Sequence, residues 1–353
     1  MTHSIITATG SYIPPARIPN SHFLGNKFYG RDGRMLERPN PEIIKKLYEI
    51  TGIRERRYAP DTMTTSEMAC LAAEQALKSI DRESLDYIIV AQNFGDITTD
   101  HLKPDMVPTI AARVKHKLKI KNPYTVAFDI PFGCPGWLQA AIMADYYIKS
   151  GDAKRVLIIG AEILSRVADP HDIDCMIYAD GAGAALIEAT DRKVGILSHL
   201  TRSDTYNDAY LLYYGKSYNP QRNGRDLFIK MQGHEIYKYA VRKVPEVVKK
   251  NLDKAGIDLV DVKKVLIHQA NGKMDEAILK RLFELYDIKE IPDNLMPMTI
   301  SWCGNSSVAT LPTLLDLVLK GNLDNHTLHP GDIAVFASVG AGMNINSMVY
   351  QMP

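Results

Sequence analysis

Cysteine is scarce in this sequence. The four cysteines among 353 residues have neither CxxC spacing nor the density of a disulfide scaffold, so we expect a reducing compartment. Long apolar runs are missing too. No stretch approaches the roughly 20 residues that span a bilayer, and the opening MTHSIITATGSYIP lacks a basic segment followed by an apolar one. These absences predict a cytoplasmic protein without a membrane segment.

Neither sign of charge dominates, because 42 Lys and Arg face 41 Asp and Glu, for a formal net charge of +1. Such a chain has no global field for nucleic acid, so a basic partner site must be local. Histidines such as His171 and His234 have no partner at metal-ligand spacing. The glycine-containing segments 180–185 and 340–342 are incomplete as phosphate or dinucleotide motifs. We therefore expect no metal, no cofactor and no nucleic-acid partner.

Short apolar runs rich in β-branched residues alternate with longer stretches of helical spacing. Near-continuous apolar strands joined by helices predict a buried, mainly parallel sheet in a layered α/β fold. The predicted strands are Tyr87–Ala91, Val126–Ile130, Val156–Gly160, Val265–His268 and Ile333–Ala337.

An internal repeat is visible along the chain. The paired segments occur in the same order at offsets of 175 and 172 residues, which predicts two similar halves, 1–190 and 191–353. Equivalent strand ends would then face one another at a pocket between the halves. The pairs are Ala76–Asn93 with Asn251–Asn271, and Cys134–Glu162 with Ser306–Gly342.

Three polar residues occupy such strand ends. Cys134 lies between a predicted strand and a helix, where the helix N-terminus lowers a thiol pKa and favours a nucleophile; the alternative is a small core residue. His268 ends a strand and is either a base or hydrogen-bond donor, or a satisfied core histidine. Asn305 precedes a helical run and could simply be its N-cap. None of the three is decisive alone.

The order of motifs along the chain is more specific. The chain resembles the ketoacyl synthase III family, the initiating condensing enzymes of the thiolase superfamily, over almost its full length. The resemblance implies a thiolase-like duplicated α/β fold in five layers, α-β-α-β-α, and a catalytic triad at Cys134, His268 and Asn305. It rests on GSYIP, TGIRER at Thr51–Arg56, AFDI and CPG around Cys134, IIGAEILSRVADP, DGAGAA at Asp180–Ala185, HQAN at 268–271 and GNSS at 304–307.

The family's chemistry implies a role for each of these residues. Cys134 would carry the acyl group, and loss of CO₂ from malonyl on acyl carrier protein would generate an enolate that His268 and Asn305 stabilise. A second oxyanion hole would use the backbone N–H groups of Cys134, Ala341 and Gly342. Ala341 departs from the family's triple glycine and cannot adopt a glycine-only conformation cheaply. The resemblance also implies a homodimer, with the segment 93–108 as a candidate contact.

A carrier-protein site is expected on the helix after HQAN. Lys273, Lys280 and Arg281 recur at about one and two turns, and Lys238 is a candidate to join them. Carrier proteins are acidic, and Lys273 and Lys280 coincide with basic positions of the family's docking patch. The alternative is an ordinary solvated cationic face.

The acyl donor is where the sequence leaves the family pattern. The tryptophan and arginine that sandwich the coenzyme A adenine fall at Lys46 and Ile50, and Arg166 alone of that set is retained to hold the thioester arm. Val107 aligns with the phenylalanine that closes a short acyl pocket. We therefore expect a carrier-bound, medium-length or bulky acyl donor rather than acetyl-CoA, unless Tyr48 takes the adenine.

The sequence is compatible with four functions, which we rank in order of preference. The first is the decarboxylating condensation that initiates fatty-acid synthesis, and the second a specialised ketosynthase with a resorcinol- or polyene-type product. The third is a non-catalytic thiolase-fold partner, which has no need of an intact Cys-His-Asn set. Thioester hydrolysis without condensation is a minor fourth.

Overall fold

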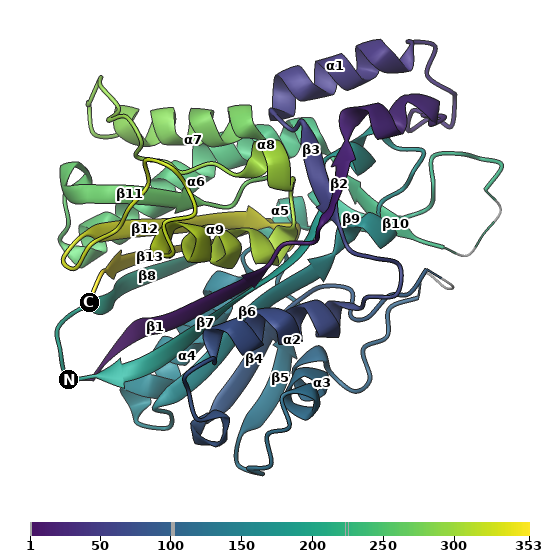
Figure 1. Cartoon of the computed structure of the whole chain (residues 1–353). Helices are drawn as coiled ribbons and strands as arrows, with labels where there is room; N and C mark the ends of the chain where they lie inside the picture. Colours follow the sequence, from purple (N-terminus) through teal and green to yellow (C-terminus); the bar gives the residue numbers. More distant parts are fainter. Residues whose placement is uncertain (1, 100–102, 223, 225) are drawn as a thin grey trace.

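Two β-sheets form the centre of the computed structural model, which describes residues 2–99, 103–222, 224 and 226–353. The first sheet has the order β1-β7-β6-β4-β5 and the second β11-β12-β13-β8 (Figure 1). Their strands are β1 (His3–Tyr12), β4 (Tyr87–Ala91), β5 (Val126–Ile130), β6 (Arg155–Ile163), β7 (Asp180–Thr190), β8 (Gly195–Ser203), β11 (Val262–Ile267), β12 (Ile333–Gly340) and β13 (Asn344–Gln351).

The sheets are mixed, which corrects the expectation of a mainly parallel sheet. Strands β4, β5 and β6 are mutually parallel, as are β11 and β12. The pairs β1·β7, β6·β7, β12·β13 and β8·β13 are antiparallel. The five predicted apolar runs correspond to the parallel strands alone. Four of these strands, β4, β6, β11 and β12, are largely buried and have continuous apolar segments, whereas the edge strand β5 is only partly buried.

Helices cover both outer faces of the pair of sheets and fill the space between them. Helices α4 (Gly136–Ser150) and α9 (Thr310–Leu319) lie in the middle, in one apolar cluster with residues of both sheets. Helices α2 (Thr65–Ala76) and α3 (Ile110–Lys117) pack on the first sheet, and α6 (Gly233–Ala255) and α7 (Gly272–Glu284) on the second. The five-layered thiolase-like α/β fold is confirmed.

Local sequence explains where these helices begin and how closely they pack. The Thr64 side chain and Glu67 form a capping box at the start of α2. A Cβ atom at Gly10 of β1 would lie 2.3 Å from the carbonyl oxygen of Ala72, so only glycine lets α2 lie this close to the sheet.

The repeat has a structural counterpart. The unit α2–β4 corresponds to α6–β11, and α4–β6 corresponds to α9–β12. All strands of the first sheet fall within residues 3–190 and all strands of the second within 195–351. The division into halves 1–190 and 191–353 stays a prediction, and this distribution of strands supports it.

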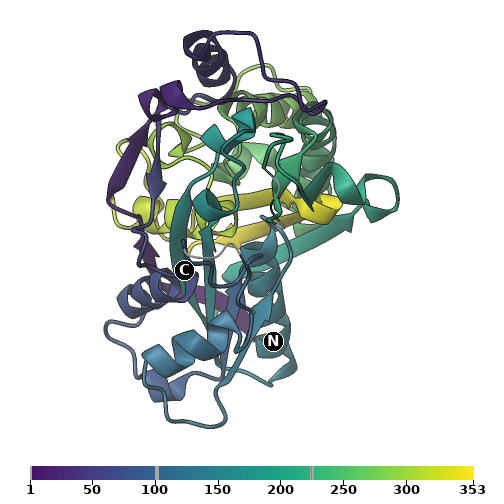
Figure 2. The same ribbon diagram turned by 90° about the vertical axis from the view of Figure 1, so that its right-hand side faces the viewer.

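Several elements lie outside the layers. Helix α1 (Asn40–Thr51) lies at one end of the molecule, dark purple in Figures 1 and 2. Strands β2 (Ala16–Pro19) and β3 (Glu55–Tyr58) pair with each other, as do β9 (Leu212–Gly215) and β10 (Phe228–Met231). Two short α-helices of the described residues, α5 (Thr205–Asp208) and α8 (Ile300–Cys303), also lie outside the layers. In the described part of the chain no helix is long and apolar enough to cross a bilayer.

Candidate active site

Cys134 lies in the turn between β5 and α4, directly before the helix begins at Gly136. Its neighbour Gly133 has a φ of +63°, a conformation that favours glycine and turns the chain sharply. Burial raises the pKa of the Cys134 thiol to about 11, although a hydrogen bond from Ser307 opposes the rise. Burial thus acts against the lowering that is expected from the helix N-terminus.

His268 follows β11, and its backbone N–H donates to the carbonyl of Ala337 (2.9 Å). Its side chain is 2% exposed, and within the described residues neither ring nitrogen has a hydrogen-bond partner. Burial lowers the pKa of His268 to about 4, so the imidazole is neutral at pH 7 and keeps one N–H donor. Such a buried donor without a partner is suited to a ligand oxygen.

Asn305 is held by backbone bonds to the segment before β7: its N–H donates to Ile177 (3.0 Å) and its carbonyl accepts from Ala179 (2.8 Å). Its side-chain Oδ1 accepts the backbone N–H of Ser307 at 2.8 Å. The Nδ2 amino group is therefore the part of Asn305 left to donate.

Gln269 ties the loops of His268 and Asn305 together. Its side-chain oxygen accepts the N–H groups of Thr299 (2.7 Å) and Ile300 (2.9 Å), and its amino group donates to Pro297 (2.8 Å). The Gln of HQAN thus fixes the chain that leads through α8 into the GN motif.

The loop after β12 closes the site beside the nucleophile. A Cβ atom at Gly340 would lie 2.6 Å from the backbone nitrogen of Cys134, and one at Gly133 would lie 2.8 Å from that of Ala341. In this loop positive φ falls on Gly342 (76°) and on Met343 (49°), not on Ala341. Alanine is therefore tolerated at the position where the family has its middle glycine, and its N–H remains near Cys134.

Cys134, His268 and Asn305 line one small cavity of about 60 Å³. A second hollow of about 210 Å³ opens from Cys134 and shares with it Ser307 and the apolar side chains of Leu164, Leu212 and Ile229. The three predicted residues are thus brought together, at the base of an apolar chamber.

Arg166 and Val107 are not placed as expected. Arg166 is 7% exposed, and its guanidinium donates to the backbone carbonyls of Ile97, Pro60 and Asp61. These donors join loops, and the role of Arg166 as a thioester arm stays a prediction. The side chain of Val107 is 84% exposed and does not line the chamber of its own chain.

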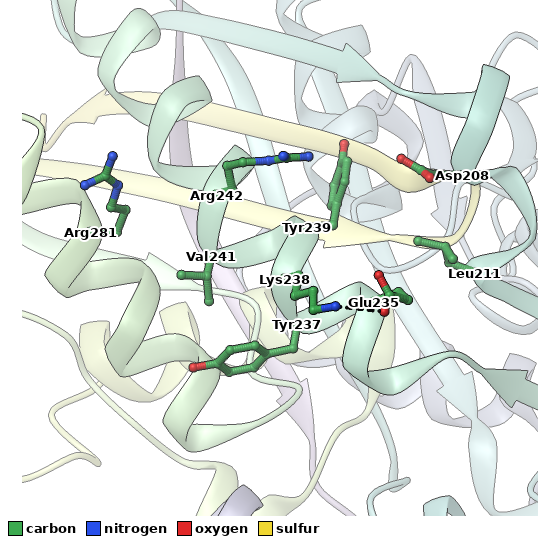
Figure 3. A pocket seen from close by; sticks show the side chains of 9 residues that line it. All are labelled: Asp208, Leu211, Glu235, Tyr237, Lys238, Tyr239, Val241, Arg242 and Arg281. Carbon is green, nitrogen blue, oxygen red and sulfur yellow. Dashed lines mark hydrogen bonds and ion pairs between the residues drawn. The ribbon is translucent and has the colours of Figure 1, made fainter.

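The basic residues divide between two places. Lys238 of α6 and Arg281 of α7 line one open groove of about 700 Å³, together with Arg242, which the sequence did not single out (Figure 3). Lys273 and Lys280 are exposed on α7 but do not line this groove. The groove also contains acids, and Lys238 donates to Glu235 at 3.1 Å.

Sequence reasoning also missed residues around the nucleophile. Ser307 belongs to the quoted GNSS motif, yet its contact with Cys134 spans 173 positions of the chain. Glu162 and Asn93 lie at the ends of β6 and β4 and contact each other. Among the described residues, no group of three or more His, Cys, Asp or Glu side chains is arranged to hold a metal ion.

A half-buried cysteine, a neutral histidine and an asparagine amide at one apolar chamber, with backbone N–H groups beside the thiol, define a thiolase-fold acyltransferase that works through cysteine. Known proteins support this class. Two models of the 3-oxoacyl-(acyl-carrier-protein) synthase III family match the chain, the N-terminal one at residues 128–205 and the C-terminal one at 252–352.

Individual relatives agree. The β-ketoacyl-(acyl-carrier-protein) synthase III of Ehrlichia canis (strain Jake) is 33% identical over 97% of both chains. The crystal structure of the Aquifex aeolicus synthase III is 30% identical, covers 99% of both chains and superposes with a TM-score of 0.80. The priming β-ketosynthase of the R1128 polyketide pathway, at 23% identity, 99% and 96% coverage and a TM-score of 0.80, shows only a shared fold. The chain belongs to the 3-oxoacyl-(acyl-carrier-protein) synthase III family and is a condensing acyltransferase.

Proposed function

We propose that this enzyme forms an acyl thioester on Cys134 and condenses it with malonyl-acyl-carrier protein to give a 3-oxoacyl product. The observation that carries the proposal is the convergence of Cys134, His268 and Asn305 on one cavity. A scaffold would not require two unpartnered donors beside a thiol, and this disfavours the non-catalytic alternative.

In the first half-reaction, the sulfur of Cys134 attacks the donor thioester carbonyl. The oxyanion that develops accepts hydrogen bonds from the backbone N–H groups of Cys134 and of the loop Ala341–Gly342. Collapse of the tetrahedral intermediate expels the donor's thiolate, which takes up the proton that Cys134 has lost. The acyl chain then occupies the chamber walled by Leu164, Leu212 and Ile229.

In the second half-reaction, malonyl loses CO₂ and leaves an enolate thioester. The neutral His268 ring and the Asn305 Nδ2 group both donate to the thioester oxygen as it gains charge. The enolate carbon attacks the acyl-Cys134 carbonyl, and the thiolate of Cys134 is expelled to complete the turnover. A histidine that stays neutral suits this role, because a donor is needed and no positive charge has to be buried.

The nucleophile is tested by Cys134→Ala. We expect no acyl-enzyme and no condensation with an unchanged fold, because the replacement is small and costs little packing. Tryptic peptides weighed after incubation with acyl thioesters provide the measurement. Acyl label on Cys70, Cys175 or Cys303 in the variant, at the wild-type level, would refute the assignment.

The donor proposal concerns a carrier-bound, medium-length or bulky acyl group. It is supported by the apolar 210 Å³ hollow and by α1, where Lys46 and Ile50 replace the adenine-stacking pair. Tyr48 is 44% exposed on the same helix and is the competing adenine platform. Competition between acetyl-CoA and acyl-carrier donors for Cys134 distinguishes the two. A higher kcat/KM for acetyl-CoA than for every carrier donor would end the proposal and remove its support for the specialised ketosynthase.

Two further proposals concern the environment of the enzyme. A homodimer is supported by the apolar Val107 side chain, which is 84% exposed. It lies in the candidate contact 93–108, of which residues 100–102 are outside the described residues. A monomer in sedimentation at micromolar concentration contradicts the dimer. Four free cysteines support a cytoplasmic location.

A further inference from the structure

Glu162 is a buried carboxyl that the condensation steps above do not use. It lies near the end of β6, is 0% exposed, and makes no ion pair with any Lys, Arg or His in the described part of the chain. A carboxyl in such a place needs other partners, since an isolated buried charge is costly.

Those partners are N–H groups of the segment that follows β4. Asn93 donates its side-chain amino group to Oε2 of Glu162 (2.7 Å) and its backbone N–H to Oε1 (3.4 Å), and the backbone N–H of Phe94 donates as well. One carboxyl therefore fixes both the position and the side-chain orientation of Asn93.

Asn93 passes this constraint to the nucleophile. Its Oδ1 accepts the backbone N–H of Gly133 at 2.9 Å, in the residue directly before Cys134. Gly133 is in turn packed against Ala341, with its would-be Cβ only 2.8 Å from the Ala341 nitrogen. A continuous set of contacts thus runs from Glu162 to the Cys134 turn and to the backbone donors beside it.

The same segment forms a wall of the acyl chamber. Asn93 and Phe94 line the hollow beside Cys134, and the Phe94 ring stacks on Tyr214 of β9, with centroids 5.1 Å apart and planes at 20°. A change at Glu162 would therefore reach the nucleophile, the oxyanion hole and the chamber wall together.

The surroundings of Glu162 also control its ionisation. Burial raises the pKa of Glu162 to about 8, the nearby charge of Asp180 adds to this, and the N–H donors of Asn93 and Phe94 oppose it. The titratable groups that its charge affects are Cys134 and Tyr214, and ionised Glu162 raises the pKa of the Cys134 thiol.

We propose that Glu162 is a positioning residue for Cys134: through Asn93 it holds the Gly133–Cys134 turn against the Ala341 loop, and its own proton must be retained for Cys134 to ionise readily. The proposal rests on Cys134 being the nucleophile of the proposed function. It predicts a pH-dependent communication between two groups that share no direct hydrogen bond.

The test is the rate of Cys134 alkylation by iodoacetamide between pH 6.5 and 9.5, followed on the Cys134 peptide by mass spectrometry. Glu162→Gln keeps an acceptor for Asn93 but cannot ionise. We expect it to match the wild type at pH 6.5 and to react about three- to tenfold faster at pH 9.5, where wild-type Glu162 is charged, since one pKa unit corresponds to a tenfold change in thiolate.

The matched control is Glu188→Gln, which removes a carboxyl of β7 that is paired with Arg155 (2.6 Å) at the opposite end of β6. Its alkylation rate should follow the wild type at every pH. A Glu162→Gln to wild-type ratio that is constant across the pH range would mean a purely structural carboxyl and would overturn the proposal. Alkylation involves no acyl donor or malonyl group, so a failed condensation assay counts against the proposed function alone.

A second variant tests the same proposal if Glu162→Gln does not fold. Asn93→Ser removes the link between Glu162 and Gly133 while leaving both ends in place. We expect the acylation rate of Cys134 to fall at least about tenfold, with a thermal midpoint close to the wild type, because misplacement of a nucleophile is costly. Unchanged acylation would contradict the positioning role.

Discussion

Ser307 donates a hydrogen bond from its Oγ to the Sγ of Cys134 at 3.4 Å. The two residues are 173 positions apart in the chain, and this contact opposes the rise that burial causes in the thiol pKa. The nucleophile thus has a hydroxyl contact in addition to the cavity that it shares with His268 and Asn305.

Loss of this contact should slow acylation. In Ser307→Ala the thiolate of Cys134 loses a donor, so we expect a higher thiol pKa and an acylation rate up to about tenfold lower near pH 7. The pH profile of acyl-enzyme formation measures the shift. Ser306→Ala is the matched control, because Ser306 is also buried but makes no contact with Cys134 in the structure. Equal slowing in both variants would contradict the specific role of Ser307.

Removal of either enolate donor should separate the two half-reactions. His268→Ala and Asn305→Ala are expected to keep part of the acylation but to lower malonyl decarboxylation about 10²- to 10³-fold, as for other oxyanion donors. Release of labelled CO₂ from malonyl-carrier protein, measured beside acyl-Cys134 formation, provides the comparison. Wild-type CO₂ release from both variants would remove them from this role.

His268 should also make the stability of the fold depend on pH. Its pKa is about 4 when folded and near 6.5 when unfolded, so the unfolded chain binds the proton first. The contribution is complete above pH 6.5 and is lost as the pH falls toward 4, which amounts to about 3 kcal/mol. The difference in unfolding free energy between the wild type and His268→Gln should therefore change by this amount between pH 7 and pH 4. Parallel pH curves would show that His268 is not buried as a neutral ring.

The groove between α6 and α7 should contribute to carrier-protein docking. Charge reversal at Lys238 and Arg281 should lower the association rate with acidic carrier substrates, most strongly at low salt, and leave small thioester mimics unaffected. Reversal at Lys273 and Lys280, which lie outside the groove, shows how far the patch extends along α7. Equal losses with both kinds of substrate would assign the groove a structural role only.

The sequence was sufficient to predict the site residues that directly follow apolar strands. Buried parallel strands are continuous apolar runs, so the polar residues that follow them, Cys134 and His268, could be placed at one edge. Strand β7 was missed because DGAGAALIEAT is rich in small residues, which let helix α9 approach: a Cβ at Gly183 would lie 2.7 Å from Pro312.

Contacts between distant segments could not be predicted in this way. Arg166 matched a functional position by its motif, but its hydrogen bonds to Pro60 and Asp61, which cross more than 100 residues, could not be foreseen. The link between Glu162 and Asn93 crosses 69 residues, and neither is unusual in its own segment. The pattern of a single sequence indicates which face of a helix or strand is buried. It does not indicate which distant side chains contact that face.

Because the helices between the sheets contact both sheets, neither half of the chain is fully packed without the other. Trp137 of α4, from the first half, lies 6.3 Å from Phe336 of the second, and the Tyr350 hydroxyl accepts the backbone N–H of Ile6 at 2.8 Å. A gene divided after codon 190 would yield two polypeptides, each with an uncovered apolar inner surface and an incomplete triad. Neither polypeptide could carry out the chemistry without the other, so selection acts on the two parts as one inheritable unit.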